Sequence, residues 1–209
     1  MQDCCNRRIR VDKYPSFEEL KAQEAEGAYR VEAVDRGSAA CIIAPHGGKI
    51  EPGTSELTRR VAGQDLSYYL FEGIKGDGNA DLHITSSRFD EPKGDALVRN
   101  CDFAFALHGC RGAEEVVYIG GRHQALALRI QAQLEKLGFT VATHPNPELQ
   151  GVCRDNICNR GRLGMGVQLE ISRGLRDRFA RERMEANTST ADDITTAIRQ
   201  AISKTIGSD

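Results

Sequence analysis

Two histidines and one glutamate in this sequence are placed where they could hold a metal ion. His46 and His108 each stand at the end of a short apolar run, and Glu51 follows His46 by five residues. In an open α/β sheet the carboxyl ends of the strands form the edge at which ligands bind, so both imidazoles are expected there. Five residues of helix would turn through about 500°, so Glu51 can meet His46 only across a loop. The Gly-Gly and Pro-Gly pairs of this segment permit such a loop.

This set of ligands predicts the chemistry of hydrolytic zinc. Two histidines and a glutamate leave the fourth tetrahedral position of Zn²⁺ open to water, as in catalytic rather than structural sites. Hydrolysis also needs a base, and Glu170 is the candidate because it interrupts the largely apolar run 167–171. Two simpler interpretations stay open. The histidines could be ordinary loop residues, and Glu170 could face solvent from an edge strand.

The surrounding sequence alternates between apolar runs and helical patterns, which is typical of an α/β fold with a mixed sheet and helices on both faces. Strands are predicted at 29–34, 39–44, 68–71, 103–107, 116–119, 139–142 and 167–171. Helices are predicted at 16–20, 55–63, 126–137, 173–183 and 194–206. No repeat or long linker divides the chain, so we expect a single domain over residues 1–209.

Composition argues against several classes of function. The 209 residues carry 28 Lys and Arg against 30 Asp and Glu, a net charge of −2, which argues against a nucleic-acid partner. No apolar stretch is long enough to span a membrane and the N-terminus lacks the layout of a secretory signal, so we expect a cytoplasmic protein with no membrane partner. The seven cysteines include no Cys-x-x-Cys pair, and reduced thiols are expected.

Five short blocks, taken in order, resemble the poly-gamma-glutamate hydrolase family of bacteriophages and related bacterial genes. The blocks are Ala44-Pro-His-Gly-Gly-Lys-Ile-Glu-Pro-Gly-Thr-Ser-Glu-Leu57, Leu82-His-Ile-Thr-Ser-Ser-Arg-Phe-Asp90, Ala106-Leu-His-Gly109, Val117-Tyr-Ile-Gly-Gly121 and Gln168-Leu-Glu-Ile-Ser172. They span most of the chain, and the first is the most specific. The resemblance implies a zinc carboxypeptidase-like fold, zinc on His46, Glu51 and His108, and Glu170 as the catalytic base.

The substrate that the resemblance implies is an anionic polymer, a chain of glutamates joined through their side-chain carboxyls. Cations should therefore gather around the cleft, and our candidates for binding the substrate include Arg88 and Arg160. Arg160 stands in a segment that is rich in amide and guanidinium groups. His83, in the second block, either contacts the substrate or fills a turn.

Other interpretations of the same residues stay open. Four residues separate His46 from Glu51, whereas the wider carboxypeptidase pattern is His-x-x-Glu, and this leaves Glu56 as a rival ligand. The site would also serve a zinc amidohydrolase that acts on small acyl-amino acids or peptidoglycan stems. A third interpretation is a binding domain with the fold but without catalysis. The predicted oligomeric state is a monomer, and a phage-encoded enzyme would leave the cytoplasm when its host lyses.

Overall fold

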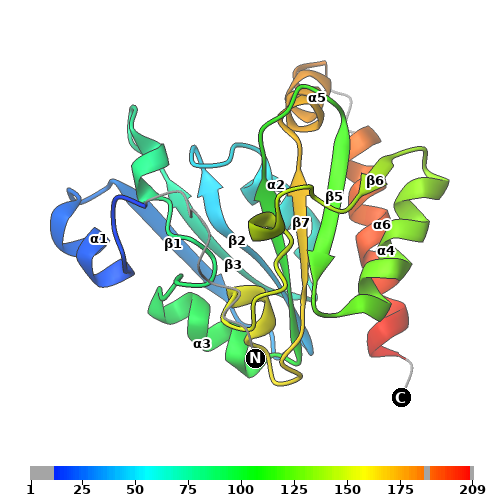
Figure 1. Ribbon diagram of the computed structural model, residues 1–209, viewed down its shortest axis with the longest axis horizontal. Helices are drawn as coiled ribbons and strands as arrows, with labels where there is room; N and C mark the ends of the chain where they lie inside the picture. The colour runs from blue at the N-terminus through cyan, green and yellow to red at the C-terminus, as the bar shows by residue number, and fades with distance from the viewer. Residues whose placement is uncertain (1–11, 186–188, 208–209) are drawn as a thin grey trace.

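Seven strands form one mixed sheet in the computed structural model, which describes residues 12–185 and 189–207 (Figure 1). Across the sheet the order is β1 (Tyr29–Val34), β3 (Ser67–Gly73), β2 (Ala40–Gly48), β4 (Phe103–Gly109), β7 (Val167–Ile171), β5 (Val116–Gly121) and β6 (Thr140–Ala142). β1 is antiparallel to β3 and β5 is antiparallel to β7, whereas the other neighbouring strands are parallel. The mixed sheet expected from the sequence is therefore confirmed.

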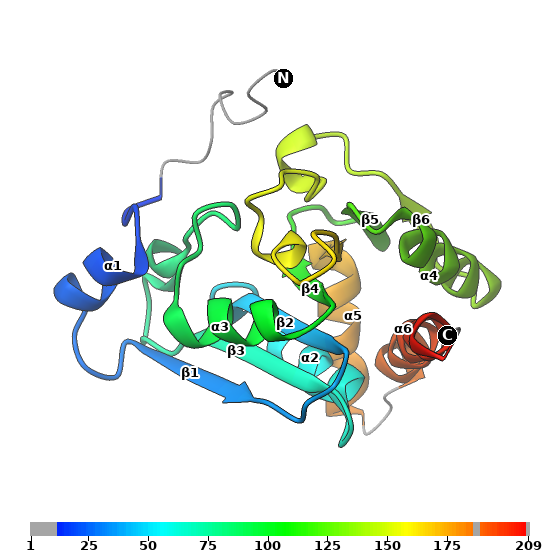
Figure 2. The ribbon, with the colours of Figure 1, turned by 90° about the horizontal axis from the view of Figure 1, so that it is seen from below.

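Helices cover both faces of the sheet, which explains why its strands are apolar on both sides. One face packs against α2 (Thr54–Ala62), α4 (Gln124–Lys136), α5 (Arg173–Met184) and α6 (Ser189–Ile206). The other face packs against α1 (Phe17–Gln23), α3 (Pro92–Asn100) and the 3₁₀ turns Asn79–Leu82 and Ile157–Asn159. A third 3₁₀ turn lies at Pro147–Leu149. Figure 2 shows α4 and α6 side by side and apart from α3.

Alternation along the strands assigns each side chain to one of these faces. In β2, Ile42 belongs to the core on the α2 face and Ile43 to the core on the α3 face. Leu107 of β4 and Leu169 of β7 lie on the α2 face. The residues that follow them, His108 and Glu170, must therefore point to the α3 face.

Helix α3 was not predicted from the sequence. Its buried apolar side chains are Leu97 and Val98, which are adjacent and give no helical period. The sequence marks only the start of this helix. Pro92 occupies the first turn, and the carboxylate of Glu91 caps the helix by accepting a hydrogen bond from the N–H of Gly94. No helix of residues 12–185 and 189–207 is long and apolar enough to cross a membrane.

Candidate metal centre

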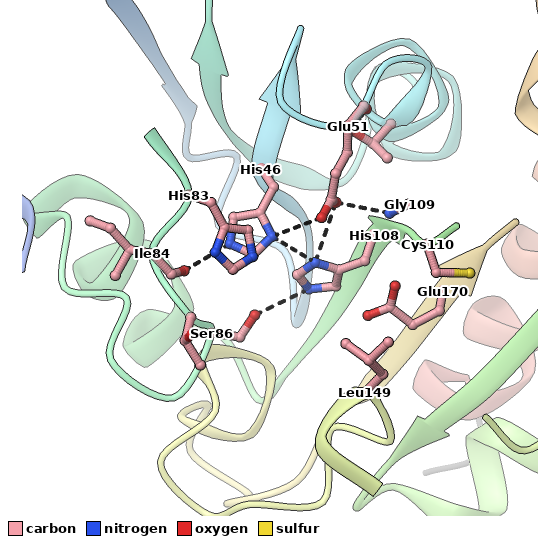
Figure 3. A network of polar contacts seen from close by, with 12 residues as sticks. His46, Glu51, His83, Ile84, Ser86, His108, Gly109, Cys110, Leu149 and Glu170 are labelled. Carbon is pink, nitrogen blue, oxygen red and sulfur yellow. Dashed lines mark hydrogen bonds and ion pairs between the residues drawn. The ribbon is translucent and has the colours of Figure 1, made fainter. Parts of the chain in front are cut away.

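The three predicted ligands converge at the carboxyl edge of the sheet (Figure 3). The Nδ1 atoms of His46 and His108 lie 3.1 Å apart. Glu51 places Oε1 3.2 Å from Nδ1 of His46 and Oε2 3.6 Å from Nδ1 of His108. Zinc bonds of about 2.0–2.1 Å at the tetrahedral angle hold two ligand atoms about 3.3 Å apart. The three side chains therefore fit a tetrahedral zinc ion with one position left over.

A bulge in β2 turns His46 toward this site. His46 comes two residues after Ala44, which packs on the α2 face, so a regular strand would point both the same way. The pairing of β2 with β3 shifts register between Ala44 and Gly47. As a result the His46 ring lies on the α3 face, with its centroid 6.3 Å from that of Phe89. The N–H of Glu51 then donates to the carbonyl of His46 over 2.9 Å and closes the loop.

The rival ligand Glu56 lies outside the cluster. Its carboxylate forms ion pairs with Arg60 at 3.0 Å and with Arg183 at 2.8 Å. It stands in the first turn of α2, whereas Glu51 precedes that helix. The structure therefore brings Glu51, and not Glu56, to the two histidines.

Each histidine has a partner at its other ring nitrogen. Nε2 of His46 lies 2.8 Å from the carbonyl oxygen of Ile84, which can only accept, so in the neutral ring Nε2 carries the proton and Nδ1 the lone pair. Nε2 of His108 lies 3.5 Å from Oγ of Ser86, a longer contact. Partners of this kind orient the imidazoles that bind metals. Both rings therefore present Nδ1 to the space that they share with Glu51.

The backbone donates a hydrogen bond to the carboxylate of Glu51, and a buried arginine anchors the loop that carries this residue. The N–H of Gly109 donates to Oε2 of Glu51 over 2.8 Å. Arg176 of α5 is 7% exposed, and its guanidinium donates at 2.9–3.1 Å to the carbonyls of Pro52, Cys110 and Ile171. It thereby joins the loop of Glu51 to the ends of β4 and β7. The fit is close, because a Cβ on Gly109 would lie 2.6 Å from Cζ of Arg176.

Glu170 lies directly beside the candidate ligand His108. The register between β4 and β7 pairs the two residues, and Figure 3 shows the carboxylate projecting from β7 toward the histidines. β7 is a central strand and Glu170 is 4% exposed, so the interpretation as a solvent-facing residue of an edge strand was wrong. Nε2 of Gln168 donates to its Oε1 over 3.0 Å.

Burial and neighbouring charges set the ionisation of these groups. Burial disfavours the charged form of Glu51, but the two histidines outweigh it and hold its pKa well below the usual range. Burial, reinforced by the charge of Glu51, raises the pKa of Glu170 well above 4.5. Burial also lowers the pKa of His108 below 6.5, which favours the neutral imidazole that metals bind. The cluster thus pairs an anionic ligand with a carboxyl that readily holds a proton.

His83 and Arg88 meet at a buried aspartate next to the centre. The ring of His83 lies 4.0 Å from that of His46, centroid to centroid. Its Nδ1 lies 2.7 Å from Oδ1 of Asp12, and Nη2 of Arg88 lies 2.7 Å from Oδ2 of the same carboxylate. The structure therefore places His83 against the candidate ligand His46, and leaves the side chain of Arg88 41% exposed.

Arg160 is bound mainly within the protein. Four of its five N–H groups donate to neighbours, namely the carbonyls of Asp155, Phe89 and Ser87 and the carboxylate of Asp95. The guanidinium therefore joins three segments of the α3 face. Its contact with the substrate stays a prediction.

Three residues that support the site had not been singled out from the sequence. For Gln168 the sequence contained a signal of its role, because Gln168 lies two residues from Glu170 in one strand and so lies on the same face of the sheet. Arg176 had none, because it is one of five arginines in the segment 173–183 and only its burial separates it from the rest. Asp12 had none either, because its partners lie more than 70 residues away in the chain.

Comparison with known proteins identifies the family to which the chain belongs. A model of the poly-gamma-glutamate hydrolase family matches residues 14–203. This chain belongs to that family. Among curated relatives, the UPF0714 protein YndL of Bacillus subtilis (strain 168) is 38% identical over 169 residues, which cover 79% of this chain and 66% of YndL. The SPbeta prophage-derived UPF0714 protein YoqZ of the same strain is 39% identical over 168 residues, which cover 80% of this chain and 61% of YoqZ.

Two solved structures have the same fold. A bacteriophage poly-gamma-glutamate hydrolase superposes with a TM-score of 0.88 at 32% identity, covering 95% of this chain and all of that chain (100%). A zinc-free structure of YndL superposes with a TM-score of 0.86 at 32% identity, covering 93% and 98% of the two chains. The expected family and its α/β fold are confirmed.

Proposed function

We propose that this member of the poly-gamma-glutamate hydrolase family is a zinc-dependent enzyme that cleaves γ-glutamyl amide bonds of the polymer. The observation that carries the proposal is the convergence of His46, Glu51 and His108 beside the buried carboxylate of Glu170. Family membership supports the polymer as the substrate, and the zinc-free form of YndL supports zinc as the metal. The likeness to zinc carboxypeptidases is part of this proposal.

The residues of the cluster divide the chemistry between them. His46, Glu51 and His108 would hold the metal ion. Zinc, when bound, supplies a Lewis acid that polarises an amide carbonyl and lowers the pKa of water. Glu170 takes a proton from the attacking water and later delivers it to the departing amine nitrogen. Its raised pKa suits this task, because the carboxyl has to keep the proton between the two steps.

Binding of the polymer is assigned to His83, Arg88 and Arg160. A γ-linked chain carries a free α-carboxylate on every unit, and a protein with a net charge of −2 must attract it with local cations. Arg88 is exposed enough to reach it, and His83 lies against the ligand His46. Arg160 has one N–H beyond the four that donate within the protein.

The deciding experiment is incubation of the purified protein with poly-γ-glutamate, with and without a chelator, followed by polymer length on a gel. We expect one zinc ion per chain and shortening of the polymer that the chelator blocks. Bound zinc without shortening would contradict the polymer as substrate and point to small acyl-amino acids or stem peptides. Protein that binds no zinc would favour a binding domain.

A further inference from the structure

A chain of two buried amides lies behind Glu170. Nε2 of Gln168 donates to Oε1 of Glu170 over 3.0 Å, and Nδ2 of Asn156 donates to Oε1 of Gln168 over 2.9 Å. Gln168 is 3% exposed and Asn156 is 5% exposed, so bulk water cannot replace either partner. Buried amides with every contact made restrict the groups that they touch. The chemistry described above uses neither of these two side chains.

Backbone groups at the two ends set the direction of this chain. The N–H of Cys158 donates to Oδ1 of Asn156 over 3.0 Å, and since a backbone N–H can only donate, Nδ2 has to face Gln168. The carbonyl of Leu149 accepts from Nε2 of Gln168 over 3.1 Å, and since a carbonyl can only accept, Nε2 has to lie on that side. Turning either amide would set two acceptors or two donors against each other. Gln168 therefore offers an N–H, and not an oxygen, to Glu170.

The backbone also confines Gln168 sterically. Gly151 has a φ of +64°, and a Cβ at this position would lie 2.9 Å from both Cβ and Oε1 of Gln168. The carbonyl of Gly151 accepts from Nδ2 of Asn159 over 2.7 Å, which fixes this part of the loop. The Gln168 side chain is thus held along its whole length.

The result is a carboxylate with two unequal oxygens. Oε1 of Glu170 accepts the N–H of Gln168 and is therefore the less basic oxygen, which leaves Oε2 as the better proton acceptor. Glu170 itself is paired with His108 across the two strands. A carboxylate free to rotate would present either oxygen and would spend time in unproductive orientations. We propose that Gln168 is a positioning residue that makes Oε2 the proton-accepting oxygen of Glu170, and that Asn156 holds Gln168 in the required orientation. The inference rests on the proposed role of Glu170 as the base.

Two variants test the two steps of this chain. Gln168→Met has a similar length but no donor. Asn156→Asp keeps the acceptor for the N–H of Cys158 but loses the donor, so its carboxylate opposes Oε1 of Gln168 and should displace the Gln168 amide from Glu170. We expect each variant to lower kcat about tenfold, with KM within about twofold of wild type and zinc retained.

Asn79→Asp is the matched control. Asn79 is also buried, at 6% exposed; it accepts from the N–H of Lys75 and donates to the carbonyl of Lys75 rather than to Gln168, and aspartate again keeps the acceptor and loses the donor. It should lose thermal stability to a similar degree and keep the wild-type kcat. If kcat instead follows the melting temperature across all three variants, the amides only stabilise the fold and the inference is wrong.

Crystal structures of the zinc-free variants supply a readout that does not depend on activity. We expect the Glu170 carboxylate to be turned or displaced in Gln168→Met and Asn156→Asp and unchanged in Asn79→Asp. If the wild-type protein does not shorten the polymer, the proposed function fails, and these structures still decide the positioning role. A Glu170 carboxylate that keeps its place in both variants overturns that role.

Discussion

Two carboxylates in one site hold different proton affinities because their neighbours differ. Glu51 lies between two imidazoles and accepts the N–H of Gly109, so its anion is stabilised despite burial. Glu170 has one amide donor, is fully enclosed, and faces the charge of Glu51. Such a pair, with pKa values pushed apart, suits the proposed roles of Glu51 as a metal ligand and Glu170 as the proton carrier.

Replacing the proton carrier should stop turnover without removing the metal. In Glu170→Gln we expect kcat to fall about 10²–10⁴-fold, because an amide cannot take up the proton. Zinc content should stay at one ion per chain, because the ligands His46, Glu51 and His108 are untouched. Steady-state kinetics and metal analysis measure the two quantities. A kcat within tenfold of wild type would remove Glu170 from the role of base.

Replacing a ligand should remove the metal together with the activity. His108→Ala should lose both zinc and activity, because two protein ligands bind the ion far more weakly than three. His123→Asn is a suitable control, since His123 is also buried but packs against Phe103 at the other end of β4. It should keep its zinc. Stoichiometric zinc in His108→Ala would refute the ligand assignment.

At the scale of elements, the site depends on the way three strand ends meet one helix. His46 lies at the bulge of β2, His108 lies near the end of β4, and Glu170 lies near the end of β7. Helix α5 follows β7 directly, and the guanidinium of Arg176 in this helix donates to backbone carbonyls next to these strand ends. The helix therefore stabilises the site without contributing a ligand.

Removing that contact should cost stability and weaken metal binding. Arg176→Met removes three hydrogen bonds to backbone carbonyls and leaves that of Cys110 buried without this donor, and we expect the free energy of unfolding to fall by about 2–4 kcal/mol, measured by urea denaturation. Zinc affinity should fall with it, since the loop of Glu51 loses its anchor. Arg173→Met in the same helix removes only an exposed pair with Asp177, and should change stability by about 0.5 kcal/mol or less. Equal effects of the two substitutions would contradict this account.

At the scale of the whole molecule, one aspartate joins the segment before α1 to the edge of the site. Asp12 accepts hydrogen bonds from His83, from the N–H of Thr85 and from Arg88. Burial opposes its charge, but these bonds outweigh burial and hold its pKa at about 2. Burial and the charge of His46 lower the pKa of His83 to about 4.

These shifts predict how stability depends on pH. An unfolded imidazole has a pKa of about 6.5, so on acidification the unfolded chain takes up a proton at His83 before the folded one does. The contribution of His83 is fully present above about pH 6.5 and is lost as the pH falls toward 4, by up to about 1.4 kcal/mol per pH unit. Asp12 adds a loss below about pH 4.

The control for this prediction is His83→Gln, whose amide can still donate to Asp12. Urea denaturation of the metal-free protein across this pH range should show a slope that is shallower in the variant by about one proton. Identical slopes for the variant and the wild type would show that His83 titrates alike in both states.

Much of the fold and the chemistry of the site could be predicted because their signals are local. The apolar run before His46 and the stripe of Ile194, Ile198, Ile202 and Ile206 are readable from spacing alone. The first three isoleucines are buried as expected, whereas Ile206 is 37% exposed at the end of α6. Helix α3 was missed because its two buried apolar residues form no period, and only its terminal signals mark it.

The residue types at the strand ends limit the chemistry available to this protein, because they include the possible ligands and the possible base. Packing of the chain selects which of them act together. The choice of Glu51 over Glu56 depends on a loop that closes onto His46, and the placement of His46 depends on a register shift between neighbouring strands. Arg176 reaches Cys110 across 66 residues of chain, and Asp12 reaches His83 across 71. Contacts at such separations arise from packing of the whole chain, and no local pattern records them.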